Sequence, residues 1–178
     1  MKFFKKRSVA LILCVLLVLA STLVNIRWKL GSQAQRVSAV FYDEDGVAPQ
    51  LEIILAEGDT LAAVAERYGL DIGGLRDSTG SLRLLLQRRS LDTEQMYWTY
   101  DALRYELRST EQKLLAAALS EGDASAVSAS LERIRSAQSA MSASSYNSLA
   151  RRFLARNGST LTRAMARLAG VAMPEVFA

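Results

Sequence analysis

The chain has 178 residues, half of them apolar, with two prolines and no histidine. This length fits one domain with a real core, and the composition favours a helical protein over a sheet protein. The net charge of +4 does not indicate a nucleic-acid binder, because Lys2, Lys5, Lys6 and Arg7 account for the whole excess and leave the rest of the chain neutral. We therefore predict an all-α protein that has no nucleic-acid partner.

Residues 8–26 form an uncharged run of 19 residues, SVALILCVLLVLASTLVNI. As a helix, at about 1.5 Å per residue, this run spans about 28 Å, which is close to the hydrocarbon thickness of a bilayer. Arg27, Trp28 and Lys29 follow at once and place an interfacial aromatic between two cations where the helix leaves the lipid. We predict a transmembrane helix over 8–26, and a leader cleaved after Ala20 is the alternative.

The basic residues are denser before this run than after it. Residues 1–7 form a basic leader, whereas the cations that follow the run are spread over residues 27–36. By the positive-inside rule, the leader is cytoplasmic and the C-terminal part lies outside the cytoplasm. We predict a single-pass protein of the cell membrane with the lipid bilayer as its first partner. Residues 27–46 are predicted to form a juxtamembrane helix extension and turn, and residues 47–178 a helical bundle.

Residue types that commonly carry catalysis are scarce in this chain. There is no histidine, and Cys14, the only cysteine, lies within the predicted span. No phosphate-binding loop or serine-nucleophile motif occurs, so nucleophilic or general-base chemistry would rest on carboxylates and lysine alone. We predict that the protein is not an enzyme and has no catalytic residue, cofactor, metal site or small-molecule substrate. An unrecognised hydrolase is the alternative.

Helix start and stop signals divide the rest of the chain. A proline in the first turn and Gly69 after the last turn predict a helix over residues 47–68, and a shorter helix is predicted over 75–88. Asp92, with Gln95 three positions on, predicts the N-cap of the next helix. Its apolar residues recur in steps of three and four, as in a bundle seam. The seam residues are Met96, Tyr100, Leu103, Leu107, Thr110, Leu114 and Ala117.

The last third of the chain is predicted to hold one long helix and one short helix. Gly122 and Asp123 indicate the boundary before the long helix, the glycine as a stop and the aspartate as an N-cap. Small residues between 136 and 148 predict close contact with a neighbouring helix. Residues 157–160 end the long helix and cap the short one, over 161–168. The long helix is expected to carry Val127, Leu131, Ile134, Ala137, Met141, Leu149 and Phe153.

Near the C-terminus, Tyr-Asn is followed by Arg-Arg-Phe, a short apolar helix, a glycine and Pro-Glu-x-Phe. This arrangement resembles the C-terminal signature of the LemA family. The matching residues are Tyr146, Asn147, Arg152, Phe153, Leu161, Gly170, Pro174, Glu175 and Phe177. The leader also resembles the divergent, clostridial-type branch of that family. The matching residues there are Phe41, Tyr42, Asp43 and Gly46, after the span and residues 36–40. Gly158-Ser159-Thr160 stands where the family usually has Phe-Pro.

The resemblance implies a single-pass membrane protein with an antiparallel bundle of long helices and no established enzymatic activity. Such a protein would be an extracytoplasmic scaffold or interaction module, and its partner an unidentified protein or a second copy. For the C-terminal motif we predict packing: Asn147 bonds the returning tail, and Phe177 docks beside Tyr146, with Phe153 as a second apolar clamp. A ligand-contacting role for these residues is the alternative.

Two other segments favour different functions. Residues 57–69, EGDTLAAVAERYG, resemble the opening of the LysM repeat, which would make the protein an envelope glycan binder. The residues that flank this segment lack the strands that a LysM module needs. Asp43-Glu44-Asp45-Gly46 resembles part of a calcium loop, but the ligand spacing and the terminal bidentate glutamate are missing, so a solvated turn is favoured.

Overall fold

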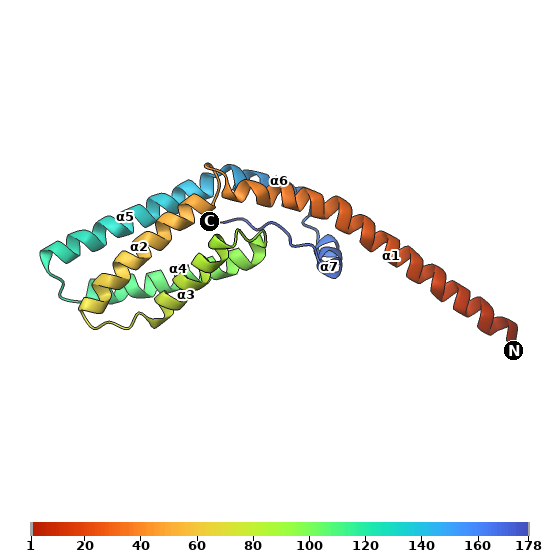
Figure 1. Ribbon diagram of the computed structural model, residues 1–178, viewed down its shortest axis with the longest axis horizontal. Helices are drawn as coiled ribbons and strands as arrows, with labels where there is room; N and C mark the ends of the chain where they lie inside the picture. Colours follow the sequence, from red (N-terminus) through yellow and green to blue (C-terminus); the bar gives the residue numbers. More distant parts are fainter. Residues whose placement is uncertain (1, 178) are drawn as a thin grey trace.

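The computed structural model describes the backbone of residues 2–177 and the side chains of residues 9–177, so the charges of the predicted basic leader lie outside the described side chains. Every regular element in the described chain is a helix (Figure 1), and the predicted all-α class is confirmed. The elements are α1 (Lys2–Ala39), η1 (Val40–Tyr42), α2 (Ala48–Arg67), α3 (Gly73–Gln87), α4 (Thr93–Ala116), α5 (Glu121–Ala143), α6 (Ser145–Asn157) and α7 (Thr160–Leu168).

Helices α2 to α5 form an antiparallel four-helix bundle. Their direction alternates along the chain, with α2 against α5 and α3 against α4 (Figure 1). The predicted seam of α4 faces the core: Met96, Leu103 and Leu114 are fully buried, and Ala117 is half-buried just past the end of the helix. Asp92 caps α4 as expected, because its Oδ1 accepts the Gln95 N–H at 3.0 Å. The predicted bundle of long helices is confirmed.

Helix α1 is a single helix of 38 residues that extends away from the bundle (Figure 1). Its N-terminal part is bare, and side chains such as Leu11 and Leu17 are each 67% exposed. Its C-terminal part is packed, since Leu30, Ala34 and Val37 line a buried face at one-turn spacing. Within the described residues it is the one helix long and apolar enough to cross a membrane, with a stretch of mean hydropathy 2.8.

Helices α6 and α7 pack against α1 and lie outside the four-helix bundle. Helix α6 runs along the part of α1 nearest the bundle, and α7 lies beside α1 farther from the bundle (Figure 1). The chain after α7 then returns to the bundle beneath α1 (Figure 1). The C-terminal third therefore covers the buried face of α1 and connects it back to the bundle.

The prediction of one long helix reaching Phe153 is wrong, because the chain breaks at Ser144. Ser144 is extended, with ψ of 154°, and its side chain accepts the N–H of Asn147 as the N-cap of α6. Both the N–H and the hydroxyl of Ser145 donate to the carbonyl of Asp45, at 3.3 and 3.2 Å. The serines at the break satisfy the backbone groups that a new helix start leaves free, so the chain turns from the bundle onto α1 at low cost.

The predicted boundary at Gly122 and Asp123 is also wrong. Helix α4 ends at Ala116, and Gly122 and Asp123 lie in the first turn of α5. Ser120 is the N-cap, since its Oγ accepts the N–H of Asp123 at 3.2 Å. The helix dipole favours an aspartate in the first turn nearly as much as one at the N-cap. The position of Asp123 alone therefore does not fix the N-cap, which lies three residues earlier than predicted.

The segment that resembles a LysM repeat is helical. Residues 57–67 are the second half of α2, which begins at Ala48, and the structure has no strand within residues 2–177. Gly69, at φ of +65°, ends this helix: its N–H donates to the carbonyl of Glu66, and the N–H of Leu70 donates to that of Ala65. The segment is a helix with a glycine stop, so the strands of a glycan-binding repeat are not formed.

Candidate functional site at the junction of the anchor helix and the C-terminal tail

Phe177 is fully buried in an aromatic cluster at the end of the bundle that α1 enters. Its ring centroid lies 5.3 Å from that of Phe41, 5.7 Å from Tyr97, and 6.0 Å from both Tyr100 and Tyr146. Phe41 and Tyr146 also meet edge-on at 5.2 Å. Edge-to-face contacts of this kind are favourable beyond the area that the rings bury. The tail thus joins α4, α6 and the end of α1 through one side chain.

Asn147 holds the backbone of the tail on both sides of Phe177. The Phe177 N–H donates to Asn147 Oδ1 at 2.9 Å, and Asn147 Nδ2 donates to the Phe177 carbonyl. The same Nδ2 donates to the carbonyl of Met141 at 2.7 Å. The hydroxyl of Tyr146 donates to the carbonyl of Glu175 at 3.0 Å. Because Asn147 is fully buried and both its donors and its acceptor are used, the amide specifies one position for the tail.

The turn between α1 and α2 contains Asp43 and Gly46. The Gly46 N–H donates to the Asp43 carbonyl at 2.8 Å, and the Val47 N–H donates to the Phe41 carbonyl at 3.0 Å. A Cβ on Gly46 would collide with the carbonyl oxygens of Val40, Phe41 and Asp43. Only glycine therefore fits this turn. The Asp43 side chain is exposed, as expected of a solvated turn.

Tyr42 joins the end of α1 to the loop between α3 and α4. Its hydroxyl donates to the carbonyl of Ser90 at 2.8 Å, and the guanidinium of Arg89 lies 5.4 Å from its ring centroid. Burial raises the pKa of Tyr42 to about 12, although the Arg89 charge acts in the opposite sense. Burial likewise raises the pKa of Tyr146 to about 12. Both phenols therefore stay neutral at physiological pH and serve as hydrogen-bond donors rather than as bases.

The remaining motif residues are divided between the core and the surface. Pro174 and Phe153 are buried, Pro174 in the tail and Phe153 on α6. Gly170 adopts φ of +65° where the tail leaves α7, a conformation that favours glycine. Arg152 is exposed on α6, outside the aromatic cluster. The structure thus brings Phe41, Tyr146, Asn147 and Phe177 together and leaves Arg152 and Asp43 at the surface.

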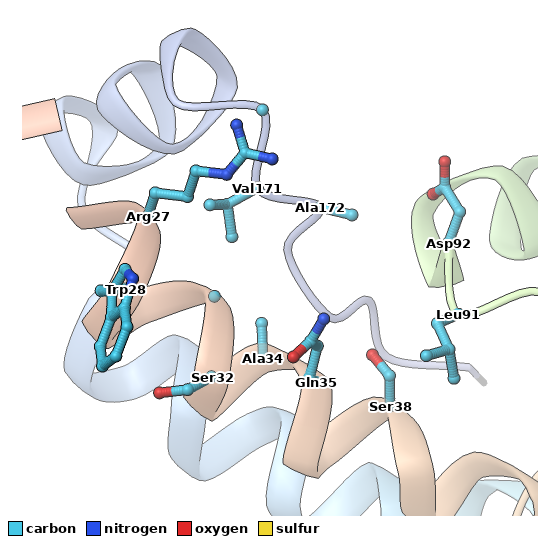
Figure 2. Close-up of a pocket in the computed structure, with 12 residues that line it drawn as sticks. Arg27, Trp28, Ser32, Ala34, Gln35, Ser38, Leu91, Asp92, Val171 and Ala172 are labelled. Carbon is cyan, nitrogen blue, oxygen red and sulfur yellow. The ribbon is translucent and has the colours of Figure 1, made fainter. Parts of the chain in front are cut away.

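A pocket of about 560 Å³ lies between α1 and the tail, and we call it the junction pocket. Figure 2 shows α1 side chains along one wall, with the tail and the α3–α4 loop opposite. The α1 wall includes Arg27, Ser32, Gln35 and Ser38, and Asp92 lies across from it. These groups offer hydroxyls, an amide and one cation, but the Asp92 carboxylate already caps α4.

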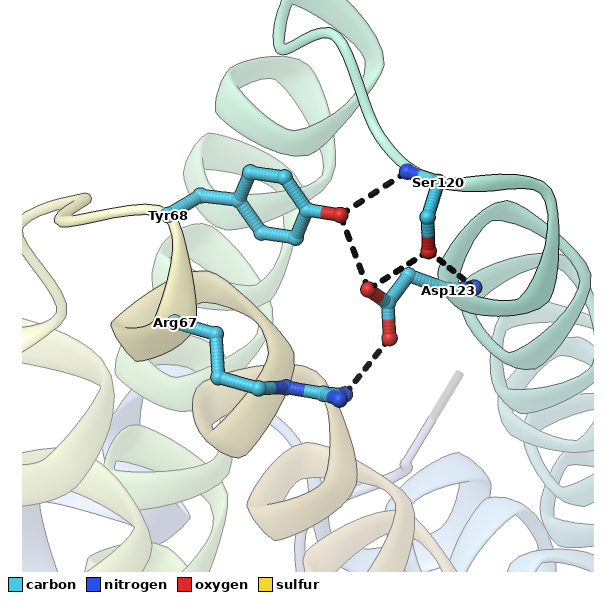
Figure 3. A network of polar contacts seen from close by, with 4 residues as sticks. All are labelled: Arg67, Tyr68, Ser120 and Asp123. Atoms are coloured by element: carbon cyan, nitrogen blue, oxygen red, sulfur yellow. Dashed lines mark hydrogen bonds and ion pairs between the residues drawn. The ribbon is translucent and has the colours of Figure 1, made fainter.

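A second polar network closes the far end of the bundle (Figure 3). The Tyr68 hydroxyl donates to Asp123 Oδ2 at 2.8 Å and accepts the Ser120 N–H at 2.8 Å. Arg67 forms an ion pair with Asp123 Oδ1 at 2.7 Å. The Tyr68 hydrogen bond, followed by that of Ser120, holds the pKa of Asp123 below its ordinary value. The network links the end of α2 to the start of α5 and has a structural role.

Several of these partners are absent from the sequence prediction. Tyr97 stands beside the seam residue Met96 and carried no signal of its own, yet its ring contacts Phe177. The bond from Tyr68 to Asp123 spans 55 positions, and that from Tyr42 to Ser90 spans 48. Tyr68 is the last residue of the helix predicted over 47–68, and a buried tyrosine needs a hydroxyl partner. That requirement was the available signal, but it does not identify the partner.

The described side chains contain no group of three or more His, Cys, Asp or Glu residues that could hold a metal ion. The hydrogen bonds and ring contacts of the site join the tail to α6, α4 and η1. No protein family, curated protein or solved structure matches the chain. The LemA resemblance therefore rests on the residues that carry it and stays a prediction.

Proposed function

We propose that this chain is a single-pass, membrane-anchored helical protein of the LemA type, whose bundle is an extracytoplasmic scaffold or interaction module. The observation that carries the proposal is the continuity of α1. One uninterrupted helix exposes most of its apolar part, packs into the folded core from Leu30 to Val37, and leads directly into η1, which holds the buried Phe41. A helix with lipid-compatible side chains at one end and packed side chains at the other couples a membrane span rigidly to a domain.

The tail strengthens this coupling. Phe41, in η1 directly after α1, contacts Phe177 and Tyr146, and Asn147 fixes the tail backbone beside them. Bending α1 away from the bundle would separate these rings and expose the satisfied amide of Asn147. The domain is therefore held in one orientation relative to the span, which is the property that a scaffold at a membrane needs.

Two exposed aromatic residues on α4 support a binding surface for a partner. Trp98 and Tyr105 are 62% and 72% exposed and lie seven residues apart on the same side of the helix. Tryptophan and tyrosine are over-represented at the centres of protein interfaces. This face supports a protein partner or a second copy of the chain as the binding target.

The proposal is tested by alkaline extraction and by thiol labelling of cells. In a Cys14→Ser background, Ser136→Cys places a thiol on the exposed face of α5. We expect the protein to stay in the membrane pellet at alkaline pH and the thiol at position 136 to react with an impermeant maleimide in intact cells. Lys5→Cys in the leader is the control and should react only after permeabilisation. Release from the pellet would refute anchoring, and the reverse labelling pattern would refute the orientation.

The interaction face is tested separately, with a photo-crosslinking residue at Trp98 in native membranes. The same residue at Ile53, an exposed position on α2, is the control. A defined crosslinked product at position 98 and its absence at position 53 would support the interaction face. Equal products at both positions, or none at either, would contradict it.

A further inference from the structure

Helix α7 lies at the level where α1 leaves its apolar run. Val171, three residues after α7 ends, lies against Gly31 and shares the junction pocket with Arg27 (Figure 2). Leu23 and Ile26, in the last turns of the apolar run, are half-buried against the folded domain. Beside α1, α7 is the folded element farthest from the bundle (Figure 1). If residues 8–26 cross a bilayer, α7 meets the surface of that bilayer.

One side of α7 packs against the protein, and an apolar stripe faces outward. Ala166 and Ala169 are buried, at 0% and 8% exposed. Leu161 and Leu168 are 75% and 73% exposed, and their spacing of seven residues places them on one face, with the exposed Ala164 between them. These two leucines are the outward part of a strongly amphipathic helix. No described residue covers this part of the stripe.

Helices α6 and α7 are strongly positive. Helices α6 and α7 have no acidic residue and carry the exposed arginines Arg151, Arg152, Arg156, Arg163 and Arg167. Two acids approach from other elements. Glu94 pairs with Arg167 at 3.3 Å. Burial raises the pKa of Glu175, and the charge of the nearby Arg163 opposes that rise. The arginines still outnumber these acids. The chain outside the basic leader has no net charge, yet α6 and α7 form a local cationic surface.

We propose that α7 is an interfacial helix that seats on an anionic phospholipid bilayer. Leu161 and Leu168 enter the boundary between headgroups and acyl chains, and the arginines of α6 and α7 bind lipid phosphates. Trp28, 78% exposed at the end of the span, belongs to the same interfacial layer. This inference rests on the membrane anchoring proposed above and adds a second point of contact, which fixes the tilt of the bundle over the membrane.

The test measures depth in the bilayer with an environment-sensitive fluorophore on single cysteines of the full-length chain. The protein is reconstituted into vesicles of equal parts phosphatidylcholine and phosphatidylglycerol that contain nitroxide-labelled lipid. The native Cys14 reports on the span. Leu161→Cys and Leu168→Cys, each with Cys14→Ser, report on α7, and Leu115→Cys in the same background, at a position 70% exposed on α4, is the matched leucine control. Vesicles of phosphatidylcholine alone carry no net charge, so they test whether the arginines of α6 and α7 contribute to lipid binding.

In the anionic vesicles, we expect the lipid nitroxide to quench the fluorophore at Cys14 and at positions 161 and 168. The fluorophore at position 115 should stay unquenched. In phosphatidylcholine vesicles, the two α7 positions should be quenched less. Quenching at Cys14 without quenching at 161 and 168 would overturn the interfacial helix while leaving the anchor intact. Absence of quenching at Cys14 would overturn the anchor itself. Equal quenching at position 115, or no difference between the two lipid compositions, would overturn the specific seating of α7 on anionic lipid.

Discussion

Truncation of Phe177 to alanine should strongly destabilise the folded domain. The ring is 0% exposed and contacts Phe41, Tyr97, Tyr100 and Tyr146, so its removal leaves a cavity lined by four other aromatic side chains. Phe-to-Ala changes at such sites cost about 3–5 kcal/mol through lost transfer free energy and the cavity. The two backbone hydrogen bonds to Asn147 do not need the ring, so they are not counted in this loss.

The assay is urea unfolding of the full-length chain in detergent micelles, followed by circular dichroism. The span stays in the micelle, so the transition reports on the bundle and the tail. Phe177→Leu keeps an apolar side chain of similar reach and should lose only about 1–2 kcal/mol. Trp98→Ala removes an aromatic residue that is 62% exposed and should change the free energy of unfolding by less than about 0.5 kcal/mol.

Hydrogen exchange gives an independent measurement of the same contact. In the wild-type chain the Phe177 amide donates to Asn147, so it should exchange far more slowly than an amide of an unstructured peptide. A loss below about 1 kcal/mol for Phe177→Ala, or free exchange of the Phe177 amide, would refute the docking of the tail and with it the rigid coupling of α1 to the bundle.

Three further predictions concern the bundle, the turn and pH. In urea unfolding, Leu107→Ala, at a seam position 5% exposed, should cost about 2–5 kcal/mol; Leu115→Ala, 70% exposed on the same helix, should cost less than about 1 kcal/mol, and equal losses would mean that the seam face is wrong. Gly46→Ala should lower the melting temperature because its Cβ meets three carbonyl oxygens, whereas Gly122→Ala, which meets open space inside a helix, should not. The pKa of Asp123 in the folded protein is held below its ordinary value of 3.8. The stabilisation that this carboxylate gives the fold is therefore complete above pH 3.8 and is lost as the pH falls through the lower folded pKa. Asp123→Asn should lack this acid-sensitive part of the stability, and parallel profiles of stability against pH for the two proteins would contradict the role of the network.

The sequence alone was sufficient for features that depend on local chemistry. The apolar run 8–26 indicates a span because its length and lack of charge are properties of neighbouring residues. The seam of α4, the cap at Asp92 and the stop at Gly69 follow in the same way from helical spacing and from the backbone needs of helix ends. The contact between Asn147 and Phe177 is not local, and its prediction came from the resemblance of the C-terminal motif and from Phe177 as the only large aromatic residue after Phe153.

Tertiary structure decided the features in which several local solutions have nearly equal energy. Ser142, Ser144, Ser145 and Ser148 all lie in one small-residue stretch, and each could have capped a new helix. The break falls at Ser144 because there α6 leaves the bundle, covers the apolar face of α1, and places Ser145 against the carbonyl of Asp45. The rings around Phe177 come from three separate elements, η1, α4 and α6. The outward leucines of α7 are defined only once its other side is packed. Which face is covered and which is left bare depends on contacts between distant residues, and periodicity along the chain does not encode that choice.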